Sequence, residues 1–193
     1  MAYVEHAQMS ITNTRQAYGW GAIALHWISA VGVIVLFFLG ERMEEAPDRA
    51  AKIAAQNLHV SVGVLLFTFL AARLLWSASQ PKPSPLETRR LFRIAAAAVQ
   101  VLFLIMIAVL LVTGPLSIWS MARPIQVFDL FAMPSPFPGP APALHEIAEE
   151  VHGAASKLFW PLIALHVGGA LKHLIVDRDG TLQRMLWVRT RKA

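Results

Sequence analysis

Four histidines in apolar stretches of this 193-residue sequence are the side chains best suited to hold a metal-containing cofactor. His152 and His166 are fourteen residues apart, so both imidazoles would leave one face of a helix about 21 Å apart along its axis. That separation suits two cofactors at two depths better than one shared metal ion. Because an ionisable side chain inside a membrane helix is costly, it usually has a function. His26 and His59, in two other apolar stretches, are the partners that the sequence offers.

The composition indicates an integral membrane protein. Hydrophobic residues make up 56% of the chain and charged residues 15%, against about 25% charged in soluble domains. The net charge of +5 could suggest nucleic-acid binding. The basic residues instead cluster at the ends of apolar stretches, as in membrane proteins, so no nucleic-acid partner is expected. The absence of cysteine excludes disulfides, covalently attached haem and cysteine-ligated iron–sulfur clusters.

Four stretches are long enough to cross about 30 Å of hydrocarbon as helices. They run approximately over 18–40, 58–76, 94–116 and 151–176. The proline-rich segment 117–150 should be extended and irregular, with its acidic part 145–150 starting the helix that enters the fourth span. Since no repeat or linker divides the chain, we expect 1–193 to form one all-α domain, a bundle of four transmembrane helices.

Lysine and arginine counts predict the orientation. The side with both termini and the 77–93 connection carries twelve of these residues, and the other side carries five. Cytoplasmic segments hold the excess of basic residues in membrane proteins. Both termini are therefore expected to be cytoplasmic, and 117–150 to lie on the opposite side.

This topology sorts the histidines by depth. His26 and His166 fall in the inner halves of the first and fourth spans, while His59 and His152 fall at the outer starts of the second and fourth. Two imidazoles that face each other across a helical bundle suit the axial positions of an iron porphyrin. The sequence therefore predicts two b-type haems, with the ligand pairs His26/His166 and His59/His152. Small residues near these ligands would leave room for a flat macrocycle: Gly19, Gly21, Gly63, Gly168 and Gly169.

Other roles are open for some of these residues. A single histidine in a span often serves packing, although four that form two level pairs favour haem ligation. His145, seven residues before His152, is an alternative outer ligand that would lie about 10 Å further out. Arg73, fourteen residues after His59 and near the depth of the inner pair, is predicted to bind haem propionates. Alternatively, its side chain extends to the inner interface.

Several motifs resemble the bacterial cytochrome b561 family, from about Tyr18 to the C-terminus. They are Ala24-Leu25-His26-Trp27, His59-Val60-Ser61-Val62-Gly63, Arg73-Leu74-Leu75, Val112-Thr113-Gly114-Pro115, Leu165-His166 and Asp177-Arg178-Asp179-Gly180-Thr181-Leu182-Gln183-Arg184-Met185. The resemblance implies a four-helix, dihaem b-type cytochrome of the bacterial inner membrane, with ligands on the first, second and fourth helices. It also implies, from some members, the oxidation of superoxide at the outer face and the reduction of ubiquinone at the inner side.

The family pattern further places a histidine one heptad after the inner ligand, matched here by His173. This side chain would lie about 10 Å nearer the inner surface than His166. A histidine titrates near neutral pH and could deliver a proton to a bound quinone, a path that Lys172 and Asp177 could extend. Alternatively, His173 anchors a haem propionate or sits at the interface. We therefore expect an oxidoreductase that carries electrons from an outer donor through the two haems to ubiquinone, with His173 catalytic.

The outer electron donor is less closely defined by the sequence. The outer segments are net acidic and would repel superoxide unless their few basic residues form a local positive patch. Those residues are Arg42, Arg49, Lys52, Arg123 and Lys157. The alternative is a haem-bearing membrane subunit that relays electrons for a separate periplasmic redox partner. A transporter that uses its intramembrane histidines for protons or a metal would be a colourless protein.

Overall fold

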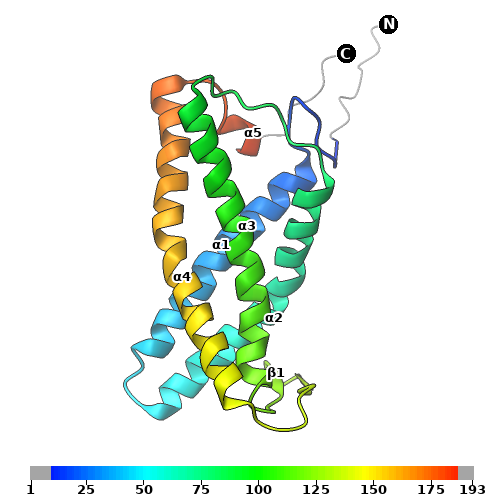
Figure 1. The fold of residues 1–193 in the computed structure, drawn as a ribbon, viewed down its shortest axis with the longest axis vertical. Coiled ribbons are helices and arrows are strands. Elements are labelled where there is room, and N and C mark those ends of the chain that lie inside the picture. The colour runs from blue at the N-terminus through cyan, green and yellow to red at the C-terminus, as the bar shows by residue number, and fades with distance from the viewer. Residues whose placement is uncertain (1–9, 187–193) are drawn as a thin grey trace, which may run out of the picture.

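The computed structural model describes residues 10–186, and four long helices extend along its long axis (Figure 1). They are α1 (Trp20–Glu44), α2 (Arg49–Ser79), α3 (Arg90–Trp119) and α4 (Pro142–Leu171). A π-helix, η1 (Lys172–Asp177), continues α4, and a short helix, α5 (Gln183–Leu186), follows. All four long helices have the length and apolar composition needed to cross a membrane. The predicted all-α, four-helix membrane fold is confirmed.

The helices extend beyond the predicted spans at their polar ends. α2 starts at Arg49 because the Asp48 side chain accepts a hydrogen bond of 2.8 Å from the Ala51 backbone N–H and so caps the helix. α4 starts at Pro142, which needs no hydrogen-bond partner for its nitrogen in the first turn. The expectation that 145–150 begins the fourth helix is confirmed. Hydropathy marks only the part of a helix that lipid surrounds, so it misses these polar turns.

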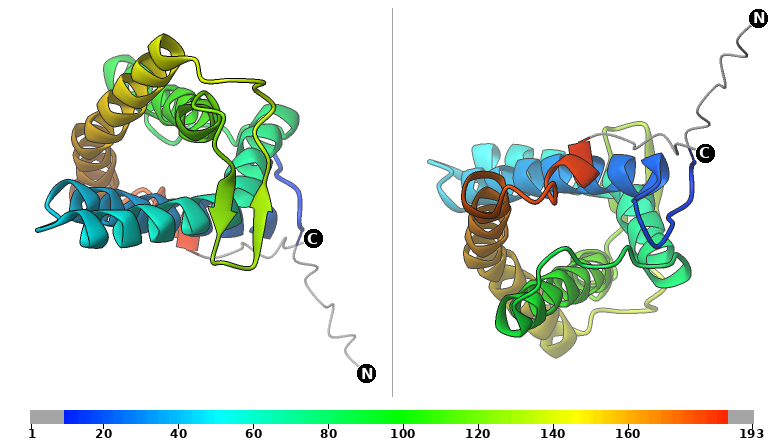
Figure 2. Two further views of the ribbon diagram at one scale, coloured as in Figure 1. Left: turned by 90° about the horizontal axis from the view of Figure 1, so that it is seen from below. Right: turned by 90° about the horizontal axis from the view of Figure 1, so that it is seen from above.

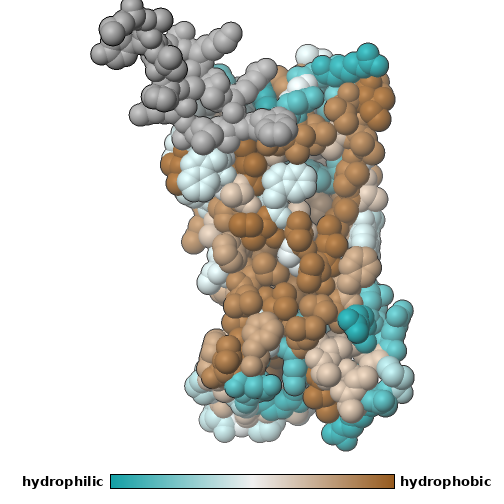
Figure 3. All heavy atoms as spheres, turned by 180° about the vertical axis from the view of Figure 1, so that it is seen from behind, coloured by the Kyte–Doolittle hydropathy of each residue, from teal (hydrophilic) through white to brown (hydrophobic). Residues whose placement is uncertain are grey.

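Apolar side chains cover the middle of the molecule (Figure 3). Large hydrophobic residues are exposed on each long helix, among them Phe38, Leu75, Leu91 and Leu165. Polar residues gather at the two ends of the same view. A belt of exposed hydrophobic residues between polar ends is the surface expected where lipid replaces water.

The bundle consists of two helical hairpins. The extensive backbone contacts join α1 to α2 and α3 to α4; α2 also touches α3, whereas α4 makes few or no such contacts with α1 and α2. Gly32 lets α1 approach α2, because a Cβ there would lie 2.8 Å from both methyl groups of Leu66. A core of Leu70, Ile107 and Phe159 joins α2, α3 and α4 near mid-bundle. Side chains, more than close backbone packing, therefore connect α4 to the first hairpin.

We call the end of the bundle near residues 10–19 the inner end and the opposite end the outer end. At the outer end, the segment expected to be irregular contains a small antiparallel hairpin, β1 (Ile125–Val127) paired with β2 (Phe131–Met133). It lies across the end of the bundle beside α2 (Figure 2, left). Ile125 and Val127 are almost fully buried, and the Phe128 backbone N–H donates to the Ser61 hydroxyl at 2.9 Å. The prolines of this segment mostly follow β2, so they do not prevent the pairing.

At the inner end, residues 10–19 cross the ends of α1 and α2. The Ser84 backbone N–H donates to the Arg15 carbonyl, and the Asn13 side chain accepts from the Gly19 N–H. A Cβ at Gly19 would lie 2.3 Å from the Ile11 carbonyl oxygen, and one at Gly21 would lie 2.9 Å from the Trp76 ring. These two glycines make room for the N-terminal segment and for Trp76, so their predicted role beside a macrocycle is wrong.

Candidate functional site

The inner histidine pair joins the two helical hairpins. His26 projects from α1 and His166 from α4, and their ring centroids are 6.0 Å apart with planes inclined at 56°. Trp27 meets the His26 ring edge-on at 5.2 Å, and Phe103 of α3 meets the His166 ring at 5.5 Å. The two imidazoles thus lie next to each other, each with one aromatic ring packed against it.

The outer pair has the same construction. His59 projects from α2 and His152 from α4, with ring centroids 6.2 Å apart and planes inclined at 78°. On α3, the Thr113 hydroxyl lies 3.0 Å from His152 Nδ1 and donates to the Val109 carbonyl at 2.8 Å. The structure therefore brings together both pairs that depth alone had predicted, His26 with His166 and His59 with His152.

The spacing of each pair fits an iron held between two imidazoles. A metal–imidazole bond of about 2.0 Å, with the ring centre about 1.1 Å behind the nitrogen, would put two in-line rings roughly 6.2 Å apart. The observed 6.0 and 6.2 Å agree with that distance. Beside the α4 histidines the helix surface is open, because a Cβ at Gly153, Gly168 or Gly169 would meet nothing within 4 Å. These residues fit the b-type haems that the sequence predicts.

Arg73 of α2 lies at the inner pair, where its Nη2 atom is 3.2 Å from His26 Nδ1. A guanidinium only donates hydrogen bonds, so Nδ1 must accept here. A histidine that binds iron through Nε2 carries its hydrogen on Nδ1, so this contact and that ligation exclude each other. Iron ligation would release the guanidinium, which could then reach a haem carboxylate. The propionate role of Arg73 stays a prediction.

His145 and Lys157, the other titratable residues near the outer pair, are engaged elsewhere. His145 Nδ1 lies 2.6 Å from the Ser117 carbonyl oxygen and ties the start of α4 to the end of α3. Lys157 pairs with Glu44 at 3.7 Å, and both side chains are exposed. The ring beside His59 is that of His152, so His145 is not placed as a second outer ligand.

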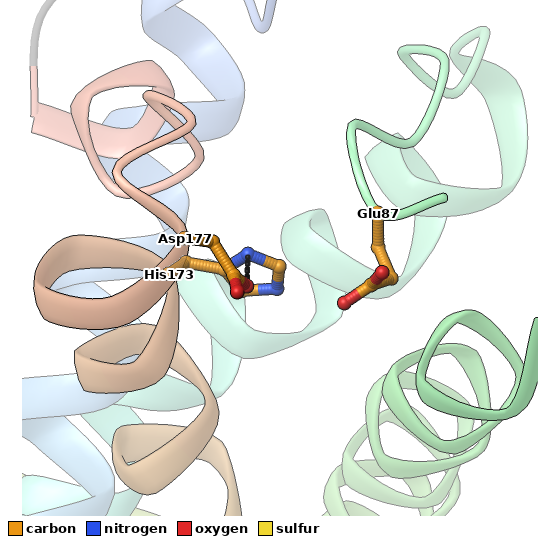
Figure 4. Close-up of side chains that lie close together, drawn as sticks. All are labelled: Glu87, His173 and Asp177. Atoms are coloured by element: carbon orange, nitrogen blue, oxygen red, sulfur yellow. Dashed lines mark ion pairs between the residues drawn. The ribbon is translucent and has the colours of Figure 1, made fainter. Parts of the chain in front are cut away.

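His173 lies in a charged cluster at the inner end, at the start of the π-helix. Its Nδ1 atom is 2.8 Å from Asp179 Oδ2 and 3.1 Å from Asp177 Oδ2. Figure 4 shows His173 beside Asp177, with Glu87 reaching toward them from the loop that precedes α3. Lys172 links the two sides, because its Nζ is 2.9 Å from Glu87 Oε2 and also pairs with Asp177.

The pKa values of two carboxyl groups in this cluster, those of Glu87 and Asp179, are lowered. The hydrogen bond from Lys172, with a second from the Arg89 backbone N–H, lowers the pKa of Glu87. Burial acts to raise the pKa of Asp179, but hydrogen bonds from Thr181 and His173 outweigh it and lower the pKa. Both groups are therefore held as carboxylates around His173.

Sequence reasoning missed the roles of Glu87, Thr113 and Asp179 in these sites. Glu87 comes from a distant loop, and no local pattern reveals its contact with Lys172. Asp179 lies six residues after His173 in a motif that the family resemblance already included. Thr113 was visible as a polar residue in an otherwise apolar span, which is a usable signal for a hydrogen-bonding role inside a membrane.

The chain is similar in sequence to known proteins along most of its length. Residues 17–187 match the family described as prokaryotic cytochrome b561. The chain is 34% identical to cytochrome b561 homolog 2 of Escherichia coli (strain K12) over 183 residues, which cover 92% of this chain and 95% of that protein. It is 23% identical to cytochrome b561 homolog 1 of the same organism over 165 residues, covering 85% and 93% of the two chains.

Proposed function

Because the chain belongs to the prokaryotic cytochrome b561 family, we propose that His26 with His166 and His59 with His152 each bind one b-type haem. Members of the family carry electrons across a membrane with b-type haem, and this chain is therefore a membrane electron-transfer protein. The observation that carries the proposal is the presence of two imidazole pairs, at 6.0 and 6.2 Å, between the two helical hairpins. The α4 members of the pairs are separated by about 21 Å of helix.

Each haem, when bound, supplies a one-electron redox centre whose potential the surrounding protein sets. His26 with His166, and His59 with His152, would each hold one haem, and with two histidines on each iron the chemistry would be electron transfer rather than binding of an external ligand. Trp27 and Phe103 each pack edge-on against one histidine of the inner pair. The protein would then transfer electrons from a donor at the outer end to an acceptor at the inner end.

At the inner end we propose ubiquinone as the acceptor, with His173 as the proton donor. Quinone reduction consumes two electrons and two protons, so the site needs a titratable group in contact with the cytoplasm. The His173 ring, with a 14% exposed side chain, is held between the carboxylates of Asp177 and Asp179. A proton that it gives up would be replaced from water on the cytoplasmic side. The alternative in which His173 anchors a propionate is weakened by this contact with two carboxylates, which would repel a third.

At the outer end we propose superoxide as the donor. Each superoxide would lose one electron and leave as dioxygen, so two would supply the electrons for one quinol. Lys157 is paired with Glu44 at 3.7 Å, so the carboxylate offsets the attraction of this lysine for an anion. Arg123 is exposed in a shallow depression that Gln56, Asn57 and Gln126 also line, and we propose it as the basic residue that receives the anion.

A second candidate function is supported by the β1–β2 turn. Phe128, Leu130 and Phe131 are exposed there, Leu130 to 81%. Apolar side chains at the tip of an outer hairpin suit a docking surface for a periplasmic redox partner. Purified protein that reduces a short-chain ubiquinone with enzymatically generated superoxide, without any added protein, would favour the first function. Dependence on a partner would favour the second.

Visible spectroscopy of purified variants tests the haem proposal. Replacing either member of a pair by alanine should remove or alter the same haem and spare the other. The four variants are His26→Ala, His166→Ala, His59→Ala and His152→Ala. His145→Ala is the matched control and should keep both haems. If the His26→Ala and His59→Ala variants lost the same spectral component, the pairing would be refuted.

The His173→Ala variant tests the proposed proton donor. Its haem spectra should equal those of the native protein, while ubiquinone reduction should slow by about 10²–10⁴-fold, the usual contribution of a general acid. The His145→Ala variant controls for the loss of an imidazole at the other end of the bundle. Unchanged quinone kinetics would remove His173 from the mechanism, and loss of the inner haem would give it a structural role instead.

A further inference from the structure

Thr113 is a buried residue whose hydroxyl contacts the outer histidine pair. It lies in α3, which carries none of the paired histidines, and is only 8% exposed. Its oxygen is 2.8 Å from the Val109 carbonyl oxygen and 3.0 Å from His152 Nδ1. The hydroxyl therefore makes two hydrogen bonds at once, and their directions can be worked out.

A threonine hydroxyl has one hydrogen to donate, whereas a carbonyl oxygen can only accept. Two oxygens at 2.8 Å need a hydrogen between them, so the hydroxyl hydrogen points to Val109. The bond to the imidazole must then run the other way, with His152 Nδ1–H as donor and the hydroxyl oxygen as acceptor. A neutral imidazole carries one such hydrogen, so Nε2 of His152 keeps its lone pair. Nε2 is therefore the nitrogen that can bind a metal.

Gly114, the next residue of α3, holds the same edge of the ring. A Cβ at this position would lie 3.3 Å from His152 Cε1 and 3.6 Å from Nδ1. Because glycine has no side chain, the imidazole can pack directly against the α3 backbone here. A half-turn of the ring would exchange Nδ1 for a carbon and break the bond to Thr113. The Thr113–Gly114 pair thus fixes both the tautomer and the orientation of His152.

The inner pair has no equivalent arrangement at His26. There Nδ1 meets the guanidinium of Arg73 at 3.2 Å, which donates and cannot accept. The acceptor on His152 therefore distinguishes the outer site chemically from the His26 side of the inner site.

We propose that Thr113 is a positioning residue that holds His152 ready to bind iron and lowers the reduction potential of the outer haem. This inference rests on the proposed ligation of that haem by His59 and His152. An acceptor on the second nitrogen makes a ligating imidazole more basic. A more basic ligand stabilises ferric over ferrous iron, so the hydroxyl favours release of the electron toward the inner side.

Potentiometric titration of three purified variants tests this role. Thr113→Val keeps the shape of the side chain and removes the acceptor, Thr113→Ser keeps the acceptor, and Thr68→Val is the control. Thr68 is exposed on α2 and bonds only a carbonyl of its own helix. The outer haem is identified as the component that His59→Ala removes.

In Thr113→Val the outer haem should shift about tenfold toward the reduced form at a fixed potential, a rise of about 59 mV for a one-electron couple. Thr113→Ser and Thr68→Val should titrate like the native protein. Loss of the outer haem in Thr113→Val but not in Thr113→Ser would also support the role. An unmoved potential, or equal effects of valine and serine, would overturn it. A native protein without an outer haem would instead refute the proposed ligation.

Discussion

Replacing Gly32 by alanine tests how closely α1 must approach α2. The new Cβ would lie 2.8 Å from both Leu66 methyl groups and 3.3 Å from its Cγ, whereas carbon atoms in contact are about 3.5–4.0 Å apart. Leu66 cannot easily retreat, because it packs against the core of Leu70, Ile107 and Phe159. Overpacking costs about 1–3 kcal/mol, and alanine gains about 1 kcal/mol over glycine in a helix. The net expectation is a destabilisation of about 1 kcal/mol.

Gly40→Ala in the same helix is the matched control. A Cβ there would meet only His59 ring atoms at 3.8 Å, an ordinary contact, so the helical gain of about 1 kcal/mol should remain. For a chain of this size 1 kcal/mol moves the thermal midpoint by about 2–4 °C. The assay is thermal unfolding of the detergent-solubilised, haem-loaded protein, followed by tryptophan fluorescence. The two midpoints should differ by about 4–8 °C, with Gly32→Ala the lower.

A midpoint for Gly32→Ala equal to or above that of Gly40→Ala would refute the close approach of the two helices. The double variant Gly32→Ala/Leu66→Ala sharpens the test, because Leu66→Ala removes the methyl groups that clash. In that background Gly32→Ala should be less costly by about 0.5–3 kcal/mol, the range of coupling energies for residues in contact. If the destabilisations of the two single variants simply added in the double variant, the cost of Gly32→Ala would not come from a clash with Leu66.

Three further outcomes are expected. Since the hydrogen bond from Lys172 lowers the pKa of Glu87 from 4.5, the stability it contributes is present at neutral pH and lost as the pH falls through the lowered value. Glu87→Gln should therefore reduce the dependence of the thermal midpoint on pH as the pH falls below 4.5; an unchanged slope would contradict this. A reporter enzyme that works only outside the cytoplasm should be silent when fused after Ala193, and activity would reverse the predicted orientation. Lys157→Gln should lower the midpoint by no more than about 4 °C, because exposed ion pairs contribute about 0–1 kcal/mol, and a larger fall would show a structural role.

The pairing of the histidines could be predicted because depth follows from topology. Once four spans are identified, the number of residues from each span end to His26, His59, His152 and His166 fixes their level, and residues at one level can meet. The helical period then places His152 and His166 on one face. No knowledge of how the helices pack was needed, only the alternation of chain direction across the membrane.

The remaining features depend on contacts between distant segments. The β1–β2 hairpin is held by the Phe128 N–H bond to Ser61, 67 residues away, and its turn has φ of 46° at Phe128 rather than the glycine that would have signalled it. Gly19 looked like a residue beside a macrocycle, although it serves the N-terminal segment. The π-helix after α4 has no recognisable pattern in the sequence. Asp177 could be named as a neighbour of His173 from the sequence, but the contact with Asp179 depends on how the chain turns after this helix.

The division into two helical hairpins bears on how the protein is made. The ribosome completes α1 and α2 well before α3 and α4, and each hairpin can enter the bilayer as a unit. In each pair, however, one histidine belongs to the first hairpin and one to the second. Under the proposed ligation, neither nascent half would supply both ligands of a haem, so both haems would be bound only after translation of α4. In a cell short of haem, the two hairpins would therefore be joined by side-chain contacts such as the core of Leu70, Ile107 and Phe159, without the bridges that the haems would add.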